Sequence, residues 1–310
     1  MTDPVIRTED LTRHFGSVRA VDGLSLQVPA GIIFGFLGPN GAGKTTTIRL
    51  LLGLLEPTSG RASVLGFDTR TESDRIRELT GALLEHAGLY ERLSAEDNLE
   101  FYGRVWHAPA AERRERSKDL LMHLGLWERR RDLVGTWSRG MKQKLALART
   151  LLHRPRLIFL DEPTAGLDPV AAVAVREDLA RLAASEGVTV FLTTHNLAEA
   201  EKVCQQVGVI REGRLLAVGN PEELKARTGA PRAQILGRGF DERVLGLLRA
   251  RPEVAAAQLQ DGQLSLELRG EVEMAPLVSL LVGAGAQVEE VRKGKASLEE
   301  VFLTLMEEEP

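Results

Sequence analysis

The sequence has little of what marks secreted, membrane-spanning or nucleic-acid-binding proteins. Its 310 residues contain one cysteine, Cys204, which excludes an intrachain disulfide and fits a reducing compartment. No apolar run approaches the roughly 18 residues of a membrane-spanning helix, and the start of the chain shows no secretion signal. With 40 Lys and Arg against 44 Asp and Glu, the chain has no basic excess, so we expect no nucleic-acid partner.

What the sequence does contain is enough for about two domains. Hydrophobic residues make up 43% of it, an ordinary share for a protein that buries a full core. The excess of acidic residues lies after residue 222. We predict one domain over residues 1–222 and a second over residues 232–310, with Gly229-Ala230-Pro231 as a linker. Cys204 is predicted to be a small apolar residue packed on a helix rather than a reactive thiol.

The motif with the most specific chemistry is the stretch from Gly38 to Thr45, GPNGAGKT, which matches the phosphate-binding pattern G-x-x-x-x-G-K-[ST]. An apolar run, Ile32 to Leu37, precedes it at strand length, and Thr46 to Leu52 can begin a helix. Backbone N–H groups of such a loop surround phosphate oxygens at the positive end of the helix. Lys44 can reach the terminal phosphates, and the Thr45 hydroxyl is a candidate Mg²⁺ ligand. The alternative is a plain glycine turn between a strand and a helix.

Two later strands deliver polar residues at their carboxyl ends. Leu157 to Leu160 is fully apolar and is followed by Asp161 and Glu162; Val188 to Thr194 ends at His195. In an open parallel sheet this edge is where ligands bind. One acid can hold the Mg²⁺ shell while the other polarises the attacking water. The alternatives are that the acidic pair only caps a turn and that the histidine only makes a local hydrogen bond.

Residues 75–154 are rich in helix formers, and we predict a mostly helical insertion there. Ser138 is placed to cap a helix whose apolar stripe contains Met141, Leu145, Ala148 and Leu152. The insertion also carries basic residues interleaved with acids, for which we predict a solvated face, with a contact to a partner or to acidic lipid as the alternative. These basic residues are Arg113, Arg114, Arg116, Lys118, Arg129, Arg130 and Arg131.

The amino-terminal region predicts strands at Val5 to Glu9 and Gly23 to Val28, and a further strand at Arg61 to Leu65. Leu24, Leu26 and Val28 alternate with polar residues, as a half-buried strand requires. Phe15 falls in the turn between the first two strands. Exposed there, it could stack on an adenine ring; the alternative is a core phenylalanine.

The carboxyl-terminal region predicts the order βαββαβ, which suggests a small ferredoxin-like module. The hairpin at Asp261-Gly262 is its best-supported part, and Ser297 to Leu303 reads as a capping box that opens a last helix. The predicted strands are Ala233–Leu236, Val254–Leu259, Leu264–Leu268 and Gln287–Val291, and the predicted helices are Glu242–Arg251 and Met274–Gly283.

Together these motifs, in this order over residues 5–222, resemble the nucleotide-binding subunit of an ABC transporter. The resemblance implies an α/β P-loop NTPase fold with a RecA-like mixed sheet core, a helical subdomain and the α+β ferredoxin-like module. It also assigns roles. The residues implied to bind ATP are Phe15, Gly38, Asn40, Gly41, Gly43, Lys44, Thr45, Thr46, Ser138, Gly140 and Asp168. Glu162, His195 and Lys44 are implied to be catalytic, and Thr45, Asp161 and Glu85 to contact Mg²⁺.

Two positions depart from the commonest family pattern. Glu85 stands where many members have a glutamine that touches Mg²⁺ and relays to the membrane domain. In the signature, usually written LSGGQ, Arg139 replaces a glycine and Met141 replaces the glutamine, while Ser138 and Gly140 remain. The variant Ser-x-Gly-Met-x-Gln, together with the tail, resembles bacterial exporter ATPases of drug and antibiotic efflux.

The resemblance implies an ATPase that powers export of a drug-like, lipid or polysaccharide compound through a separate membrane permease. ATP and Mg²⁺ are the implied cofactors. Two copies are implied to dimerise on binding ATP, each completing the other's site with Ser138 and Gly140, in the cytoplasm and peripheral to the inner face of the membrane. The alternatives are an importer ATPase, a translation-linked ATPase of the same superfamily, or a nucleotide sensor that does not hydrolyse ATP.

Overall fold

The structure, a computed structural model, describes residues 3–228, 232–260, 263–270, 272–294 and 297–307. The chain divides into two compact units, Met1–Gly219 and Asn220–Pro310, and we describe each by itself. The predicted linker at Gly229-Ala230-Pro231 and the predicted turn at Asp261-Gly262 lie outside the described residues. No helix within the described ranges is both long enough and apolar enough to span a membrane.

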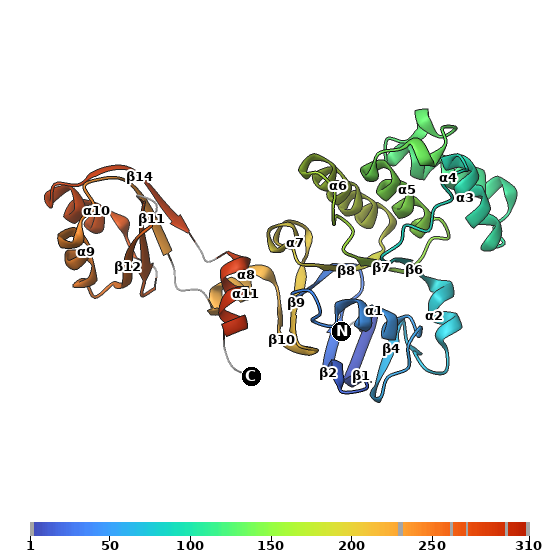
Figure 1. Cartoon of the computed structure of the whole chain (residues 1–310), viewed down its shortest axis with the longest axis horizontal. Coiled ribbons are helices and arrows are strands. Elements are labelled where there is room, and N and C mark those ends of the chain that lie inside the picture. The colour runs from blue at the N-terminus through green and yellow to red at the C-terminus, as the bar shows by residue number, and fades with distance from the viewer. Residues whose placement is uncertain (1–2, 229–231, 261–262, 271, 295–296, 308–310) are drawn as a thin grey trace. The chain divides into compact units, whose positions relative to one another are not determined.

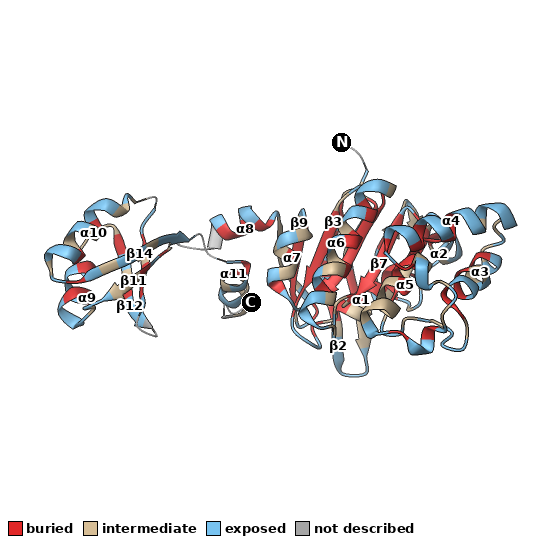
Figure 2. Ribbon diagram, turned by 90° about the horizontal axis from the view of Figure 1, so that it is seen from above, coloured by how far each residue is buried: buried red, intermediate tan, exposed pale blue. Residues whose placement is uncertain are grey.

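The first unit contains a central sheet of six strands in the order β10-β9-β3-β8-β7-β6. Strands β3, β6, β7, β8 and β9 pair in parallel, and β10 pairs antiparallel with β9 at one edge. The strands are β3 (Ile33–Leu37), β6 (Thr80–Leu83), β7 (Leu157–Asp161), β8 (Thr189–Thr194), β9 (Gln206–Arg211) and β10 (Arg214–Gly219). The predicted strands Ile32–Leu37, Leu157–Leu160 and Val188–Thr194 correspond to β3, β7 and β8, and each of these three strands is buried along its length (Figure 2).

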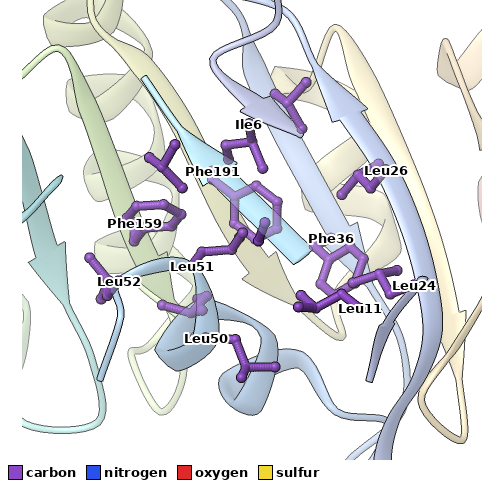
Figure 3. Packing of buried hydrophobic residues seen from close by; sticks show 14 of the residues in the cluster. Ile6, Leu11, Leu24, Leu26, Phe36, Leu50, Leu51, Leu52, Phe159 and Phe191 are labelled. Atoms are coloured by element: carbon purple, nitrogen blue, oxygen red, sulfur yellow. The ribbon is translucent and has the colours of Figure 1, made fainter. Parts of the chain in front are cut away.

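A second, antiparallel sheet in the order β2-β1-β4-β5 packs with helix α1 (Lys44–Leu51) over the central sheet. Its strands are β1 (Ile6–Phe15), β2 (Val18–Val28), β4 (Ser59–Val64) and β5 (Phe67–Asp68). The predicted alternation in β2 is confirmed, since Leu24, Leu26 and Val28 are buried. The core lies between the two sheets, with leucines of α1 against phenylalanines of the central strands (Figure 3). It fixes the start of α1, and with it the phosphate-binding loop, relative to β7 and β8.

The helical part of this unit groups α3, α4 and α5 together, away from the β1–β2 sheet (Figure 1). The helices are α2 (Ser73–Leu79), α3 (Ala95–Val105), α4 (Ala110–His123), α5 (Arg139–Leu151), α6 (Pro169–Glu186) and α7 (Leu197–Val203), with short 3₁₀ turns η1 (Trp127–Arg129) and η2 (Val134–Thr136). The predicted insertion over residues 75–154 also contains β6, a strand of the central sheet, so it is interrupted by a strand after α2. The apolar stripe of α5 is confirmed at Leu145, Ala148 and Leu152.

The prediction of a solvated basic face is wrong at two arginines of α4. Arg113 forms a two-point ion pair with Glu100, at 2.9 and 2.7 Å. Arg116 is 5% exposed, pairs with Glu186 at 2.7 and 2.9 Å, and donates to the carbonyl of Leu151. The hydrogen-bonded ion pair with Arg113 lowers the pKa of Glu100 to about 2. Arg116 is buried and Arg113 half-buried because each pairs with a carboxylate on another helix, which an alternating sequence pattern cannot reveal.

The second unit contains a four-stranded antiparallel sheet in the order β12-β13-β11-β14, the strand order of a ferredoxin-like module. Its elements are α8 (Pro221–Thr228), β11 (Arg232–Arg238), α9 (Glu242–Arg249), β12 (Val254–Gln260), β13 (Gln263–Leu268), α10 (Met274–Gly283), β14 (Gln287–Gly294) and α11 (Leu298–Glu307). The capping box is confirmed: Glu300 N–H donates to the Ser297 hydroxyl and Ser297 N–H to the Glu300 carboxylate, both at 3.2 Å.

Cys204 is buried at the end of α7, as predicted, and burial raises the pKa of its thiol to about 12. It packs against β3, where a Cβ on Gly35 would lie 2.8 Å from its Sγ. The thiol is therefore a packing group.

Candidate nucleotide site

The phosphate-binding loop connects β3 to α1. Gly43 at the helix start has φ +101°, and a Cβ there would lie 2.2 Å from the carbonyl oxygen of Ala20. A Cβ on Gly38 would lie 2.4 Å from the carbonyl oxygen of Ile210. Both positions therefore require glycine. No side chain caps the start of α1, so the first N–H groups of the helix are left for an anion.

Lys44 is held at the mouth of this loop. Its side chain is 7% exposed, and its Nζ donates to the carbonyls of Gly38, at 2.7 Å, and Pro39, at 3.2 Å. The same Nζ lies 3.3 Å from Oε1 of Glu162. The ammonium group thus sits between the loop and the end of β7, where it can neutralise phosphate charge beside the predicted base.

Asp161 is buried at the end of β7, and both of its carboxylate oxygens accept a hydrogen bond. The Thr45 hydroxyl donates to Oδ2 at 2.6 Å, and the Thr193 hydroxyl donates to Oδ1 at 2.5 Å. A hydroxyl and a carboxylate in contact are suitable ligands for Mg²⁺, which takes its remaining ligands from phosphates and water. In the described part of the chain, no group of three or more His, Cys, Asp or Glu is placed to hold a metal ion by itself.

Glu162 adopts a backbone conformation that is strained for a residue with a side chain, with φ +50°. Its N–H is held by the carbonyl and the hydroxyl of Thr193, each at 3.1 Å. Its Oε2 lies 2.8 Å from Nδ1 of His195, and its Oε1 is buried without a hydrogen bond, facing Lys44. The carboxylate is therefore fixed between the loop and His195 with one oxygen available for a water molecule.

Several of these residues line a cleft of about 480 Å³. The predicted site residues that line it are Asn40, Gly41, Gly43, Lys44, Thr45, Thr46, Glu85, Asp161 and Glu162. The predicted site residues that do not line it are Phe15, Gly38, Ser138, Gly140, Asp168 and His195.

Three of the residues outside the cleft have local structural roles. The Ser138 hydroxyl accepts from Met141 N–H at 3.3 Å, which confirms it as the cap of α5. Asp168 caps α6 in the same way, by accepting from Ala171 N–H at 2.9 Å. Phe15 ends β1 with 45% of its surface exposed, and the Arg13 guanidinium lies 4.6 Å from its ring centre. The turn predicted at Phe15 is thus shifted to the two residues after it.

Glu85 lines the cleft but points its carboxylate to Arg49, 3.7 Å away, with 63% of the side chain exposed. Its role as a metal contact stays a prediction. Sequence reasoning did not identify Thr193, whose hydroxyl joins both acids, or Gln143, whose side chain donates to the carbonyl of Pro163 at 2.7 Å. The sequence could have pointed to Thr193 because it lies near the carboxyl end of the strand before His195, at the same sheet edge as Asp161.

Comparison with known proteins matches both units. The profile described as ABC transporter matches residues 21–165, and that described as ATP-binding protein DrrA1-3-like, C-terminal domain, matches residues 219–306. The daunorubicin resistance ATP-binding protein DrrA3 of Streptomyces coeruleorubidus is 37% identical over 308 residues, covering 98% of this chain and 96% of that protein. The chain belongs to the ATP-binding subunits of ABC transporters. As such it is an ATPase, which confirms the predicted family, fold class and activity.

Other relatives of this ABC subunit match a smaller share of the chain. The bacitracin transport ATP-binding protein BcrA of Bacillus licheniformis is 41% identical over 223 residues, which cover 72% of each chain. The structure of cbiO1 from Clostridium perfringens, part of the ABC transporter complex cbiONQ, covers 72% of this chain and 91% of that one, with 28% identity and a TM-score of 0.68. The match to DrrA3 differs because it spans almost the whole chain.

Proposed function

We propose that this subunit hydrolyses MgATP to power export of a drug-like, lipid or polysaccharide compound through a separate membrane permease. The observation that carries the proposal is the end-to-end likeness to a protein named for daunorubicin resistance, in a chain whose cleft is equipped for hydrolysis. Import remains the alternative direction. It is less well supported because the matched carboxyl-terminal domain belongs to a DrrA-like family.

The residues in and beside the cleft would each have a separate role in ATP hydrolysis. Thr45 and Asp161 would hold Mg²⁺, which when bound neutralises charge on the phosphates. Lys44 binds the terminal phosphates from the loop side. Glu162 orients water for in-line attack and accepts its proton, while His195, hydrogen-bonded to Glu162, fixes the direction of that carboxylate. Holding these groups before the reaction begins lowers the cost of reorganisation.

Dimerisation on ATP binding is part of the proposal. Ser138, Gly140 and Asp168 lie outside the cleft of their own chain, as expected of residues that serve a second copy. The start of α5 presents backbone N–H groups that suit the γ-phosphate of a twin's nucleotide. The proposed place of the dimer is the cytoplasmic face of the membrane, against the permease.

The test is Glu162→Gln in the full-length protein. We expect phosphate release to fall by at least about 100-fold, because amide nitrogen and oxygen cannot accept the water proton, while MgATP is still retained. The matched control is Glu177→Gln, an exposed carboxylate on α6, which should leave the rate unchanged. An undiminished rate in Glu162→Gln would show that the base is elsewhere.

A nucleotide sensor is separated from an ATPase by the same measurement on the unmodified protein, since a sensor binds ATP without releasing phosphate. Direction of transport needs a second measurement. When the subunit and its permease are expressed together in a drug-sensitive strain, export predicts resistance that Glu162→Gln removes. Increased sensitivity, which means uptake, would contradict export.

A further inference from the structure

The first turn of α5 faces two ways. Ser138 and Gly140 do not line the nucleotide cleft of their own chain, but Arg139, which lies between them, does. Gln143, one turn later on the same helix, also lines the cleft, and its hydrogen bond to Pro163 ties this part of α5 to the loop after Glu162. Arg139 is therefore aimed at the site of its own chain by a helix end that is anchored there.

The guanidinium group of Arg139 rests against a glycine. A Cβ built on Gly166 would lie 2.4 Å from Nη1 of Arg139 and 2.6 Å from both its Cζ and Nη2. Gly166 has φ +68°, which already favours glycine. The absence of a side chain at residue 166 thus makes room for the arginine beside the loop that follows the catalytic carboxylate.

The charges around the cleft leave Arg139 in a distinct position. Three cations line the cleft, and two of them face a protein carboxylate: Arg19 lies 3.5 Å from Asp22, and Lys44 lies 3.3 Å from Glu162. The guanidinium group of Arg139, an exposed residue, has no hydrogen bond or ion pair with a residue that the structure describes. A guanidinium without a protein carboxylate, in a cleft built for phosphates, has its donors available for an anion.

We propose that Arg139 binds the phosphates of the nucleotide held by its own chain, so that one helix end serves two sites: Arg139 the cleft in the same chain, and Ser138 with Gly140 the twin's. This inference rests on the proposed function. It assigns a nucleotide contact within one chain to a position at which the commonest family pattern has glycine. The added cation strengthens binding of ATP to a single subunit before any dimer forms.

The test compares Arg139→Ala and Arg139→Lys with the unmodified full-length protein. Affinities for MgATP and MgADP are measured by titration with a fluorescent nucleotide and competition, at nanomolar protein, where light scattering shows single chains. We expect Arg139→Ala to weaken MgATP binding about tenfold, as loss of a charged hydrogen bond predicts. MgADP, with less phosphate charge, should lose less. Arg139→Lys should recover part of the loss, since lysine keeps the charge but not the planar donor pair.

The matched control is Lys142→Ala, which removes a cation from the same turn of α5. Lys142 pairs with Glu91 at 2.6 Å and does not line the cleft, so its removal should leave single-chain affinity unchanged. Equal losses of MgATP affinity in Arg139→Ala and Lys142→Ala would show that any positive charge at this helix end has the same effect, and would overturn the proposal. So would a loss in Arg139→Ala that appears only at concentrations where dimers form. If the unmodified protein bound no ATP, the proposed function itself would fail.

Discussion

The nucleotide-binding edge of the first unit and the sheet of the second unit handle backbone strain in opposite ways. In the described part of the second unit, positive φ angles occur only at glycines, namely Gly239, Gly270 and Gly285. The first unit places six residues with side chains in that region, and one of them is Glu162 at the centre of the cleft. The difference teaches how strain can serve a site: of these six residues Glu162 alone lines the cleft, and its strained backbone aims a carboxylate into it.

The two regions also differ in what they bury. The central strands end in Asp161, Thr193 and Glu162, which are buried or half-buried polar groups joined by hydrogen bonds. The inward face of the carboxyl-terminal sheet is apolar, with Ile235, Leu264 and Leu266 packed under α9 and α10. Polar burial is costly unless every partner is present, so the first region depends on particular bonds and the second on apolar area.

The largest expected effect is a loss of stability in the second unit that leaves ATP hydrolysis by the first unit intact. Leu266→Ala removes a fully buried side chain from the second core and should lower its free energy of unfolding by about 2–5 kcal/mol. Because the first unit has its own core, ATP hydrolysis at 25 °C should persist. Chemical denaturation followed by circular dichroism, with phosphate release on the same samples, measures both.

Ser265→Ala is the control for that experiment, since Ser265 lies on the same strand with its side chain on the opposite face and should cost little. If hydrolysis in Leu266→Ala were lost in proportion to the unfolding of the second unit, the two regions would not be independent, and the comparison would break.

A smaller effect is expected from Thr193→Val, which keeps the shape of the side chain but removes its hydroxyl. Asp161 loses a donor and Glu162 N–H loses one of its two acceptors, so both acids become less well fixed. We expect kcat for ATP hydrolysis to fall about tenfold with little change in stability beyond about 1–3 kcal/mol. Thr193→Ser, which restores the hydroxyl, should recover most of the rate; if it did not, the bond to Asp161 would not be what matters.

The smallest expected effect concerns backbone strain at glycines of the second unit. Gly285 has φ +97° with open space around its Cα, so Gly285→Ala should destabilise the second unit by about 1 kcal/mol through backbone strain alone. Gly246 lies inside α9, also in open space but without a positive φ, so Gly246→Ala should stabilise it by up to about 1 kcal/mol. Unfolding curves of the two variants should shift in opposite directions, and a shift in the same direction would contradict this account.

Most of the fold could be predicted from the sequence wherever apolar residues form an unbroken run or recur at a regular spacing. The apolar run Leu157–Leu160 corresponds to β7, and the alternation of Leu264, Leu266 and Leu268 corresponds to β13. Prediction failed at β6, whose four residues, Thr80–Leu83, lie between helix-rich segments and are too few to show a period. That strand forms because β7 offers it a hydrogen-bonding edge, which is tertiary information.

In the site, motifs could locate the groups predicted to contact phosphate, metal and water, but not the groups that position them. Lys44, Thr45, Asp161 and Glu162 follow from their patterns and do line the cleft. Thr193 is an ordinary strand threonine until the register of β7 and β8 brings it beside Asp161. The orientation of Arg139 toward its own cleft likewise depends on Gly166, which is 27 residues away and visible only in three dimensions.

The carboxylate of Glu300 joins the two ends of the second unit. One of its oxygens accepts from Ser297 N–H at the start of α11, and the other lies 2.8 Å from the Arg232 guanidinium at the start of β11. The start of the module's first strand is therefore held by a residue that lies 68 positions later in the chain, from 232 to 300. During synthesis this ion pair can form only after residue 300 has been added, whereas the first unit is complete in sequence by Gly219.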